Sequence, residues 1–213
     1  MRDIETEALP IVEPDQRAVT GSPAVVGIVL AAGSSQRFGD ANKLCAELNG
    51  TPIVRQSVET FSESTVSDTV VVLGHEADRV GTLLSGLAVE TIVNDEYTKG
   101  QATSVRAGVR AVCERFPAVD AIVIGLGDMP FVSVRTIDQL IQVSATSEWR
   151  ALAPIVDGIR GNPVLFDRTH FPALTDVSGD IGGQEILLEG KQSAFVSVTD
   201  TGIHRDIDRP SDF

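Results

Sequence analysis

Lysine is scarce in this chain of 213 residues, where it occurs only at Lys43, Lys99 and Lys191. The 17 lysines and arginines face 30 acidic residues, which gives a formal net charge of −13. This negative charge repels the phosphate backbone and opposes nonspecific binding to nucleic acid, so we expect no nucleic-acid partner. We interpret the composition as halophile-like, because salt screens the self-repulsion of an acidic surface. An ordinary acidic protein is the alternative interpretation.

Long apolar runs and cysteines are also few. The longest apolar stretch, Ala24 to Ala32, is interrupted by Gly27 and is far shorter than the roughly 20 residues of a membrane-spanning helix. The first residues are acidic and lack the apolar segment of a secretory signal. Cys45 and Cys113 have no zinc or redox spacing, so we expect both to be packing residues in a reducing compartment. These absences predict a cytoplasmic protein without a membrane span.

Strand-like and helix-like segments alternate from Val25 onward. Val25 to Leu30 is a short apolar run, typical of a strand buried on both faces. The alternation predicts an α/β domain with a mostly parallel sheet and helices on both sides, a three-layer α/β/α architecture. Strands are expected at residues 69–73, 89–93 and 121–126, and helices at 52–61, 76–84, 102–116 (with Cys113 on the buried face) and from Ser133 to about 144.

The two ends of the chain are less regular. Residues 1–24 show no sustained periodicity, and we expect a loose N-terminal arm followed by one domain at 25–213. In the last third, strands are expected at 151–156, 163–166 and 194–198, with short helices at 168–174 and 182–189. This part is expected to extend the same sheet.

The segment after the first strand has the features of a phosphate-binding loop. Residues 30–39 read Leu-Ala-Ala-Gly-Ser-Ser-Gln-Arg-Phe-Gly, and Lys43 follows four residues later. Small residues let backbone amides approach a ligand, and this loop lies at the ligand-binding edge of an open parallel sheet. With Arg37 and Lys43, the amides predict a polyphosphate pocket. Neither Gly-x-Gly-x-x-Gly nor Gly-x-x-x-x-Gly-Lys-Ser/Thr occurs, which disfavours a dinucleotide-dependent redox enzyme.

This loop resembles the signature of the nucleotidyltransferases similar to the molybdenum cofactor cytidylyl- and guanylyltransferases. The resemblance covers roughly residues 25 to 213 and implies a Rossmann-like sheet of the nucleotide-diphospho-sugar transferase type. Three further segments agree with it. The segment from Val93 to Gly100, continuing to Gly108, resembles the nucleobase segment of the family. The motif Gly127-Asp128-Met129-Pro130 resembles the metal-binding Gly-Asp-x-Pro. The acceptor-side pattern of the cytidylyl branch is resembled by Gly161-Asn162-Pro163-Val164-Leu165-Phe166 together with Gly179-Asp180.

The resemblance implies a magnesium-dependent enzyme that transfers CMP from CTP to the phosphate of molybdopterin and releases pyrophosphate. Both reactants are anionic, so such a transfer depends on positioning and on cations rather than on a protein nucleophile. Arg37, Lys43 and Asp128 are the implied catalytic residues, and Asp128 and Asp208 the implied Mg²⁺ ligands. A molybdoenzyme or its maturation factor is the implied protein partner.

Structural roles remain open for the two carboxylates. Asp128 follows an apolar strand, where an aspartate often forms a turn or a helix cap. Asp208 lies in the segment Asp206-Ile207-Asp208, so Asp206 is the alternative second ligand. Asp208 could instead cap a terminal helix that begins at Pro210.

Nucleotide contacts are also implied by the resemblance. Ser104 either binds the ligand or caps its own helix. The pair Ala31-Ala32 favours CTP, because the guanylyl relatives tend to carry Gly-Gly and two extra Cβ atoms narrow the base pocket. The full implied set is Leu30, Ala31, Ala32, Gly33, Ser34, Arg37, Lys43, Gly74, Asn94 and Ser104.

The acceptor side departs from the family pattern. Asn162 and Asp180 are the implied acceptor contacts, but Gln184 stands where the family often has an arginine that would suit an anionic acceptor. Three alternatives therefore remain: a guanylyltransferase, a nucleotidyltransferase with a sugar or another phosphorylated acceptor, and a nucleotide-binding module without turnover.

Overall fold

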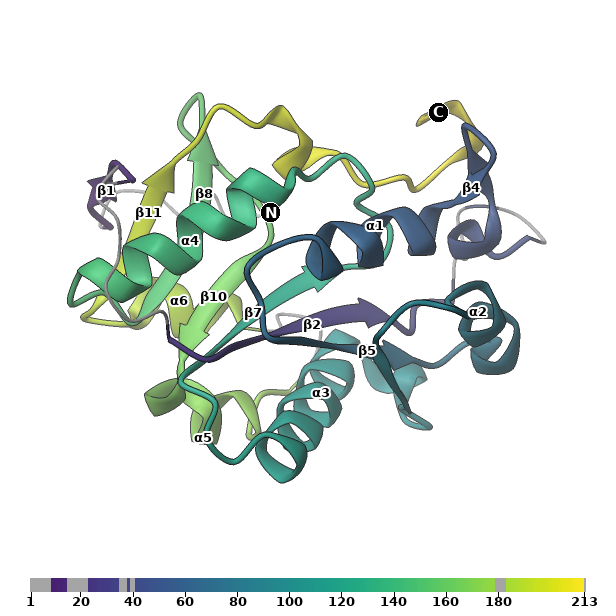
Figure 1. Ribbon diagram of the computed structural model, residues 1–213, viewed down its shortest axis with the longest axis horizontal. Helices are drawn as coiled ribbons and strands as arrows, with labels where there is room; N and C mark the ends of the chain where they lie inside the picture. Colours follow the sequence, from purple (N-terminus) through teal and green to yellow (C-terminus); the bar gives the residue numbers. More distant parts are fainter. Residues whose placement is uncertain (1–8, 15–22, 35–37, 39–40, 179–182, 213) are drawn as a thin grey trace.

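The computed structural model describes residues 9–14, 23–34, 38, 41–178 and 183–212. In these residues the central element is one nine-stranded sheet (Figure 1). Its strands are ordered β1-β11-β8-β10-β7-β2-β5-β6, with β9 paired to β8. The strands are β1 (Ile11–Val12), β2 (Val25–Ala31), β5 (Asp68–Leu73), β6 (Glu90–Val93), β7 (Ala121–Leu126), β8 (Ala151–Val156), β9 (Ile159–Arg160), β10 (Val164–Asp167) and β11 (Ser193–Ser197).

The sheet is mostly parallel, as predicted. Strand β2 pairs in parallel with β5 and β7, β5 with β6, and β11 with β8. Strand β10 is antiparallel to both of its neighbours, β7 and β8. A separate two-stranded hairpin is formed by β3 (Glu47–Leu48) and β4 (Thr51–Pro52), just before the first helix.

Helices cover both faces of the sheet, which confirms the three-layer α/β/α prediction. In Figure 1, α1 and α4 lie on one side of the sheet and α3 and α5 on the other. Buried side chains of α1, α2 and α4 form one apolar core, and those of α3, α5 and α6 form the second. The helices are α1 (Ile53–Ser62), α2 (Ala77–Leu83), α3 (Gln101–Arg115), α4 (Val134–Thr146), α5 (Phe171–Leu174) and α6 (Gln184–Glu189).

The apolar stripe of α3 explains why that segment is a helix. Val105, Val109 and Val112 are spaced at three and four residues and are buried against the sheet. The prediction that Cys113 belongs to this face was wrong, because its side chain is exposed. Cys113 lies in the last turn of the helix, at the margin of the stripe, and Val112 occupies the buried position instead.

The N-terminal arm contains one short element in its described part. Strand β1 pairs in parallel with β11, with Ile11 opposite Phe195. Ile11 is exposed, whereas Phe195 is buried, so β1 forms the outer edge of the sheet.

The strand order places a ligand-binding crevice at the ends of β2 and β7. After β2 the chain adds β5 and β6 on one side of it and then returns to place β7 on the other. Leu30 and Leu126 are paired near the carboxyl ends of these two strands, and the Gly127 amide donates to the Leu30 carbonyl at 2.9 Å. Ligands of open parallel sheets bind where the strand order reverses in this way.

Asp200 ties the C-terminal segment to the start of α4. Its carboxylate accepts hydrogen bonds from the Ser133 amide at 2.8 Å, the Thr136 hydroxyl at 2.7 Å and the Gly202 amide at 2.8 Å. The Ser133 hydroxyl in turn caps α4 as predicted, since it accepts from the Thr136 amide. Asp200 therefore determines where the final residues leave the sheet.

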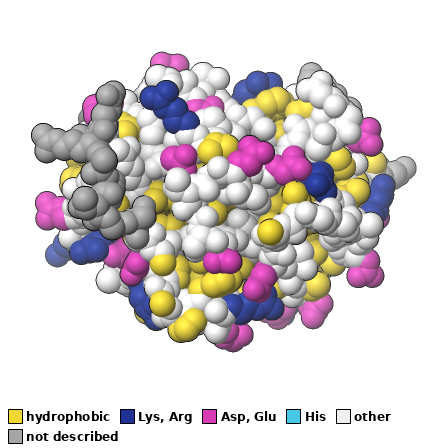
Figure 2. All heavy atoms as spheres, in the orientation of Figure 1, with side chains coloured by type: hydrophobic (Ala, Val, Ile, Leu, Met, Phe, Trp, Pro, Cys, Tyr) yellow, Lys and Arg dark blue, Asp and Glu magenta, His cyan; other side chains and the backbone are white. Residues whose placement is uncertain are grey.

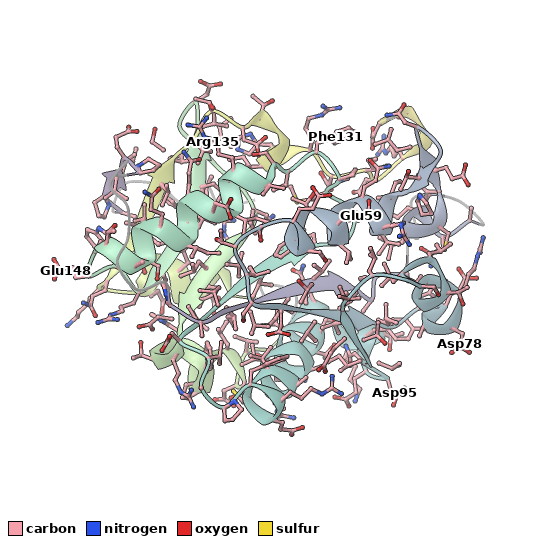
Figure 3. The ribbon with its side chains drawn as sticks, viewed as in Figure 1. Glu59, Asp78, Asp95, Phe131, Arg135 and Glu148 are labelled. Atoms are coloured by element: carbon pink, nitrogen blue, oxygen red, sulfur yellow. The ribbon has the colours of Figure 1, made fainter. Side chains whose placement is uncertain are left out.

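Two further contacts hold the tail against the loop that follows β7. The Arg205 guanidinium lies 3.7 Å from the ring centre of Phe131, which Figure 3 labels beside the C-terminal segment. The amide of Ile207, a buried residue, donates to the Asp128 carbonyl at 2.9 Å. These contacts bring the C-terminal aspartates to the crevice.

Replacing Asp200 with alanine is expected to lower the free energy of unfolding by about 2–3 kcal/mol at neutral pH, because hydrogen bonds to a charged group are lost. Burial, the largest influence, raises the pKa of Asp200, but its hydrogen bonds to Ser133, Thr136 and Gly202 outweigh it and lower the pKa overall. A lowered pKa stabilises the fold above the ordinary carboxyl range, and this contribution disappears as the pH falls through the lowered value. Urea unfolding at pH 7 and below pH 3 measures both effects; a gap that persists in acid contradicts the explanation.

Candidate active site

A cleft of about 650 Å³ opens at the crevice between β2 and β7. Its wall on the β2 side is the start of the glycine-containing loop, and the wall on the β7 side carries Asp128. The described residues that line it are Leu30, Ala31, Ala32, Gly33, Ser34, Lys43, Leu44, Tyr97, Thr98, Gly100, Gln101, Ser104, Leu126, Asp128 and Asp208.

Most residues predicted to contact the nucleotide or the metal lie together in this cleft. Leu30, Ala31, Ala32, Gly33, Ser34, Lys43, Ser104, Asp128 and Asp208 all line it. Gly74 and Asn94 lie behind its wall. Arg37 and Asp180 fall outside the residues that the structure describes, so their predicted roles stay predictions.

Lys43 is the central cation of the cleft. It begins a 3-10 turn, Lys43–Cys45, whose start is capped by the Asn42 side chain accepting from the Leu44 amide at 3.1 Å. The Lys43 ammonium lies 2.7 Å from Asp128 Oδ2 and 2.5 Å from Asp208 Oδ1. This contact joins the first loop, the end of β7 and the C-terminal segment at one point.

The carboxylates around Lys43 fit a divalent cation. Asp128, Asp206 and Asp208 each place an oxygen within 4.8 Å of the others. Asp128 Oδ1 is buried and has no hydrogen-bond partner among the described residues. The Lys43 ammonium already lies between two of these groups, where a metal cation would be attracted. Oxygen ligands of this kind suit Mg²⁺ and Mn²⁺, with the remaining positions left to phosphate and water.

Burial and charge oppose each other at this cluster. Burial is the largest influence on both groups: it raises the pKa of Asp128 and, taken alone, lowers the pKa of Lys43. The charges and hydrogen bonds of Asp128 and Asp208 outweigh burial for the lysine, so the pKa of Lys43 is raised and its ammonium stays charged. Acidic side chains are scattered over the face shown in Figure 2. Lys43 therefore provides a positive charge inside the cleft of a predominantly acidic protein.

Asn94 and Ser104 form a supporting hydrogen-bond network behind the cleft. The Asn94 amide group donates to the hydroxyls of Thr103 at 2.8 Å and Ser104 at 3.0 Å, and all three side chains are buried. Because the Ser104 oxygen accepts from Asn94, its own hydrogen can be donated toward the cleft. The α3 N-cap position is Gly100, where no side chain provides a cap, so Ser104 does not act as the N-cap. Asn94 thus orients a hydroxyl that faces the ligand space.

Gly74 allows the first loop to approach its neighbours closely. A Cβ atom at this position would lie 2.7 Å from the Ala32 methyl, 2.8 Å from the Ala32 carbonyl oxygen and 2.8 Å from the Tyr97 Cβ. The His75 amide, next in the chain, donates to the same Ala32 carbonyl at 3.2 Å. A glycine is therefore needed to let this loop lie against the segment that follows β5.

Replacing Gly74 with alanine is expected to weaken nucleotide binding by about tenfold, since the added methyl must push the backbone of Ala32 away from its present position. Titration of the variant with Mg²⁺ and CTP measures this change. Gly81, in α2 and outside the cleft, offers the matched control, because an added Cβ there would meet only the end of the Leu73 side chain, at 3.3 Å. A Gly74 variant that binds as tightly as the Gly81→Ala control would show that loop position does not determine affinity.

Four residues of the cleft were not named individually as contacts from the sequence. They line it from the turn between β6 and α3 and are Tyr97, Thr98, Gly100 and Gln101. All four lie within residues 93–108, the segment that resembles the nucleobase segment of the family. The turn also follows a parallel strand at the same edge of the sheet as the first loop, which is a positional signal for ligand contact.

Asn162, predicted to face the acceptor, lies in an adjoining pocket. That pocket has a volume of about 170 Å³ and shares Leu30, Gln101 and Leu126 with the cleft. The two spaces are therefore neighbours, and a molecule in the smaller one lies beside the contents of the larger.

Within the described ranges, none of the helices combines the length and apolar character needed to cross a membrane.

This chain is similar to known proteins over most of its length. The family model of the MobA-like NTP transferase domain matches residues 27–194. The purine catabolism protein PucB of Bacillus subtilis (strain 168) is 31% identical over 201 residues, which are 90% of this chain and 95% of that protein. Nicotine blue oxidoreductase of Paenarthrobacter nicotinovorans is 29% identical over 175 residues, 79% of this chain and 83% of that protein.

Solved structures share the whole fold. The crystal structure of Rv0371c from Mycobacterium tuberculosis H37Rv superposes with a TM-score of 0.78 at 25% identity and covers 91% of this chain and 96% of that one. Its manganese complex gives a TM-score of 0.74 at 24% identity and covers 89% of this chain and 95% of that one. With residues 27–194 matched by the family model and a relative of almost equal length above 30% identity, this chain belongs to the MobA-like NTP transferase family.

Proposed function

We propose that this enzyme of the nucleotidyltransferase type transfers CMP from CTP to the phosphate of molybdopterin, with Mg²⁺ and with release of pyrophosphate. The observation that carries the proposal is the contact of Lys43 with Asp128 and Asp208 inside the cleft at the end of β2. It combines a charged amine with a set of carboxylates, the pairing needed to hold a triphosphate and a divalent cation side by side.

In the proposed reaction, an acceptor phosphate oxygen forms a bond to the α-phosphorus of CTP. The bond from that phosphorus to the β-phosphate oxygen breaks, and pyrophosphate leaves with the electron pair. Asp128 and Asp208 would hold Mg²⁺, with Asp206 close by, and the bound ion would neutralise charge on the phosphates. Lys43 would contribute a second positive charge beside the transferred group.

The first loop would position the triphosphate. Gly33 and Ser34 line the cleft and are exposed, so their backbone is open to a ligand. Arg37 would add a further cation. Ser104, oriented by Asn94, would donate a hydrogen bond on the opposite side of the cleft. These groups hold the substrate in place, and no protein nucleophile is required.

The preference for CTP is supported by how Ala31 and Ala32 pack. Both are buried and line the cleft. An added Cβ at Gly127 would lie 3.1 Å from the Ala31 methyl, and one at Gly74 would lie 2.7 Å from the Ala32 methyl. Both methyls are therefore fixed against neighbouring backbone and cannot move aside for a larger base. This arrangement favours the smaller pyrimidine ring.

The acceptor would be the phosphorylated pterin, and the product would pass to a molybdoenzyme or its maturation factor. Asn162 supports this placement because it lines the pocket that adjoins the cleft. Asp180 would be its companion on the acceptor side.

The test is pyrophosphate release from CTP or GTP with purified molybdopterin, with Mg²⁺ or with EDTA, at low and high salt. We expect release that requires CTP, molybdopterin and Mg²⁺ together, and that persists at high salt because the surface is acidic. Release with GTP alone would move the assignment to the guanylyl branch. Tight nucleotide binding without release, across all nucleotides and acceptors, would contradict catalysis and favour a binding module.

A redox function is the second candidate, on the observation that one relative of this chain is a nicotine blue oxidoreductase. Consumption of a reduced nicotinamide cofactor by the purified protein would support it. The carboxylate cluster around Lys43 favours phosphate transfer, because it can hold the divalent cation that accompanies a nucleoside triphosphate, whereas hydride transfer has no need of such a metal site.

A further inference from the structure

The small pocket beside the cleft has a mixed lining with one charged group. Aliphatic and aromatic side chains, which include Val105, Ile124 and Phe166, form part of it. Gln101, Asn162 and Gln184 supply neutral polar groups, and Arg160 is the single charged side chain among the described residues that line it. Such a lining suits a heterocyclic ring that offers both apolar and polar edges and carries one anionic group.

The Arg160 side chain makes no hydrogen bond or ion pair with any of the residues that the structure describes, although it is partly buried. Burial without a compensating carboxylate lowers the pKa of its guanidinium. An unpaired charge in a partly desolvated place destabilises a fold. The chain has 30 acidic residues, so a carboxylate partner for this arginine could readily be present in the fold. The missing partner indicates that an external anion fills the position.

The backbone around Arg160 is held by hydrogen bonds, which fixes the point from which the side chain extends. Strand β9 is joined to β8 by a tight turn at Asp157 and Gly158, whose φ angles of 53° and 77° lie in the left-handed region that suits aspartate and glycine. Arg160 pairs with Ile155 across this hairpin. The next residue, Gly161, donates its amide to the Pro154 carbonyl at 2.9 Å.

Alternation along β9 directs Arg160 to the pocket side. Successive residues of a strand point to opposite faces, and Ile159 is 60% exposed to solvent. Arg160 therefore points away from solvent and toward the pocket that it lines. The adjacent Asn162, whose amide donates to the Ile203 carbonyl at 3.1 Å, lies in the same wall.

We infer that Arg160 binds the anionic group of the second substrate, a planar heterocycle that bears a phosphate or a carboxylate. Only the identification of this ligand as the acceptor rests on the proposed function. The apolar side chains of the pocket would contact the faces of the ring, the neutral polar side chains would contact its edges, and the guanidinium would pair with the anion through charge-assisted hydrogen bonds. Arg160 thereby selects anionic acceptors over neutral ones.

The test uses the intrinsic fluorescence of pterins. Pterin-6-carboxylate and the neutral 6-hydroxymethylpterin are titrated into the wild-type protein, Arg160→Gln and Arg135→Gln, with inorganic phosphate as a competitor. Arg135 is a matched control, because it is exposed on α4, lines neither pocket and points away from the molecule in Figure 3. We expect the carboxylate to bind at least about tenfold more weakly to Arg160→Gln, with no change in Arg135→Gln.

Two further readouts separate binding from folding. Removing an unpaired charge is expected to raise the melting temperature of Arg160→Gln by about 2–4 °C, whereas a structural arginine would lower it. Because Gln184 lines the same pocket, the double variant Arg160→Gln, Gln184→Arg is expected to regain at least part of the lost affinity. Competition by phosphate identifies phosphate as the bound anion, and its failure to compete identifies carboxylate.

The inference is overturned if wild-type protein binds neither anion, if the neutral pterin binds as tightly as the carboxylate, or if Arg160→Gln binds like wild type. Titration with Mg²⁺ and CTP keeps the proposed function separate. If the protein does not bind CTP but binds the anion through Arg160, only the proposed function is wrong. If it binds CTP but binds no anion through Arg160, only the role of Arg160 is wrong.

Discussion

Replacing Asp128 with asparagine is expected to reduce the rate of nucleotidyl transfer by about a hundredfold or more, the effect of removing a preorganised electrostatic group. Asparagine keeps the shape of the side chain but removes the charge that attracts a divalent cation. The Oδ1 atom of Asp128 is buried and has no hydrogen-bond partner among the described residues, so it is available to a metal ion. Initial rates of pyrophosphate release, compared between the variant and the wild type over a range of Mg²⁺ concentrations, measure this reduction.

The fold of this variant is expected to persist, because Lys43 retains its contact with Asp208. Asp78→Asn is the matched control: Asp78 is exposed in the first turn of α2 and points outward in Figure 3. It should release pyrophosphate at the wild-type rate. If the Asp128 variant also kept most of its rate at limiting Mg²⁺, the metal role of this residue would be wrong.

Replacing Lys43 with alanine is expected to lower the turnover rate by at least about a hundredfold. The same change is expected to lower the free energy of unfolding by about 1–3 kcal/mol. The ammonium lies between Asp128 and Asp208, whose oxygens are close enough to repel one another once it is gone. Added Mg²⁺ or Mn²⁺ should restore stability but not turnover, because it replaces the charge between the carboxylates and not the phosphate contact. Thermal unfolding with EDTA and with metal, together with turnover, measures both effects.

Lys99→Ala is the control for this change. Lys99 is exposed and pairs with Glu96 on the surface, so its loss should alter neither stability nor rate by a measurable amount. A Lys43 variant whose unfolding temperature does not respond to divalent cations would contradict the arrangement of charges described here.

The positions of Asp128 and the first loop were predictable from local patterns, whereas the metal role of Asp128 and the set of nucleotide contacts were implied by the family resemblance. The apolar runs that form β2 and β7 are recognisable as buried strands, and the residues after parallel strands meet at one edge. Seven of the implied nucleotide contacts line the cleft: Leu30, Ala31, Ala32, Gly33, Ser34, Lys43 and Ser104.

It was harder to predict which of the two C-terminal aspartates is the second metal ligand, since their position depends on contacts with distant parts of the chain. The Ile207 amide donates to the Asp128 carbonyl, and burial of Ile207 turns its two neighbours toward Lys43. No pattern in the tail alone specifies that register. Asp206 and Asp208 therefore remained alternatives in the sequence, whereas the structure brings both to the same cluster.

Arg160 and Cys113 show two other limits of sequence analysis. Arg160 lies on a strand of two residues and has no motif, and its significance comes from the lack of a side-chain partner among the described residues. Cys113 follows the helical spacing of α3 but lies at the margin of the buried stripe, which periodicity alone does not define. Both features depend on the three-dimensional surroundings of the side chain.

The most direct measurement is a crystal structure of the protein with CTP and Mn²⁺, with the metal located by its anomalous scattering. We predict an anomalous peak bound by Asp128 and Asp208, with Lys43 and the loop that begins at Ala31 in contact with the triphosphate. An ordered nucleotide bound elsewhere, with no metal at the two aspartates, would contradict the central claim.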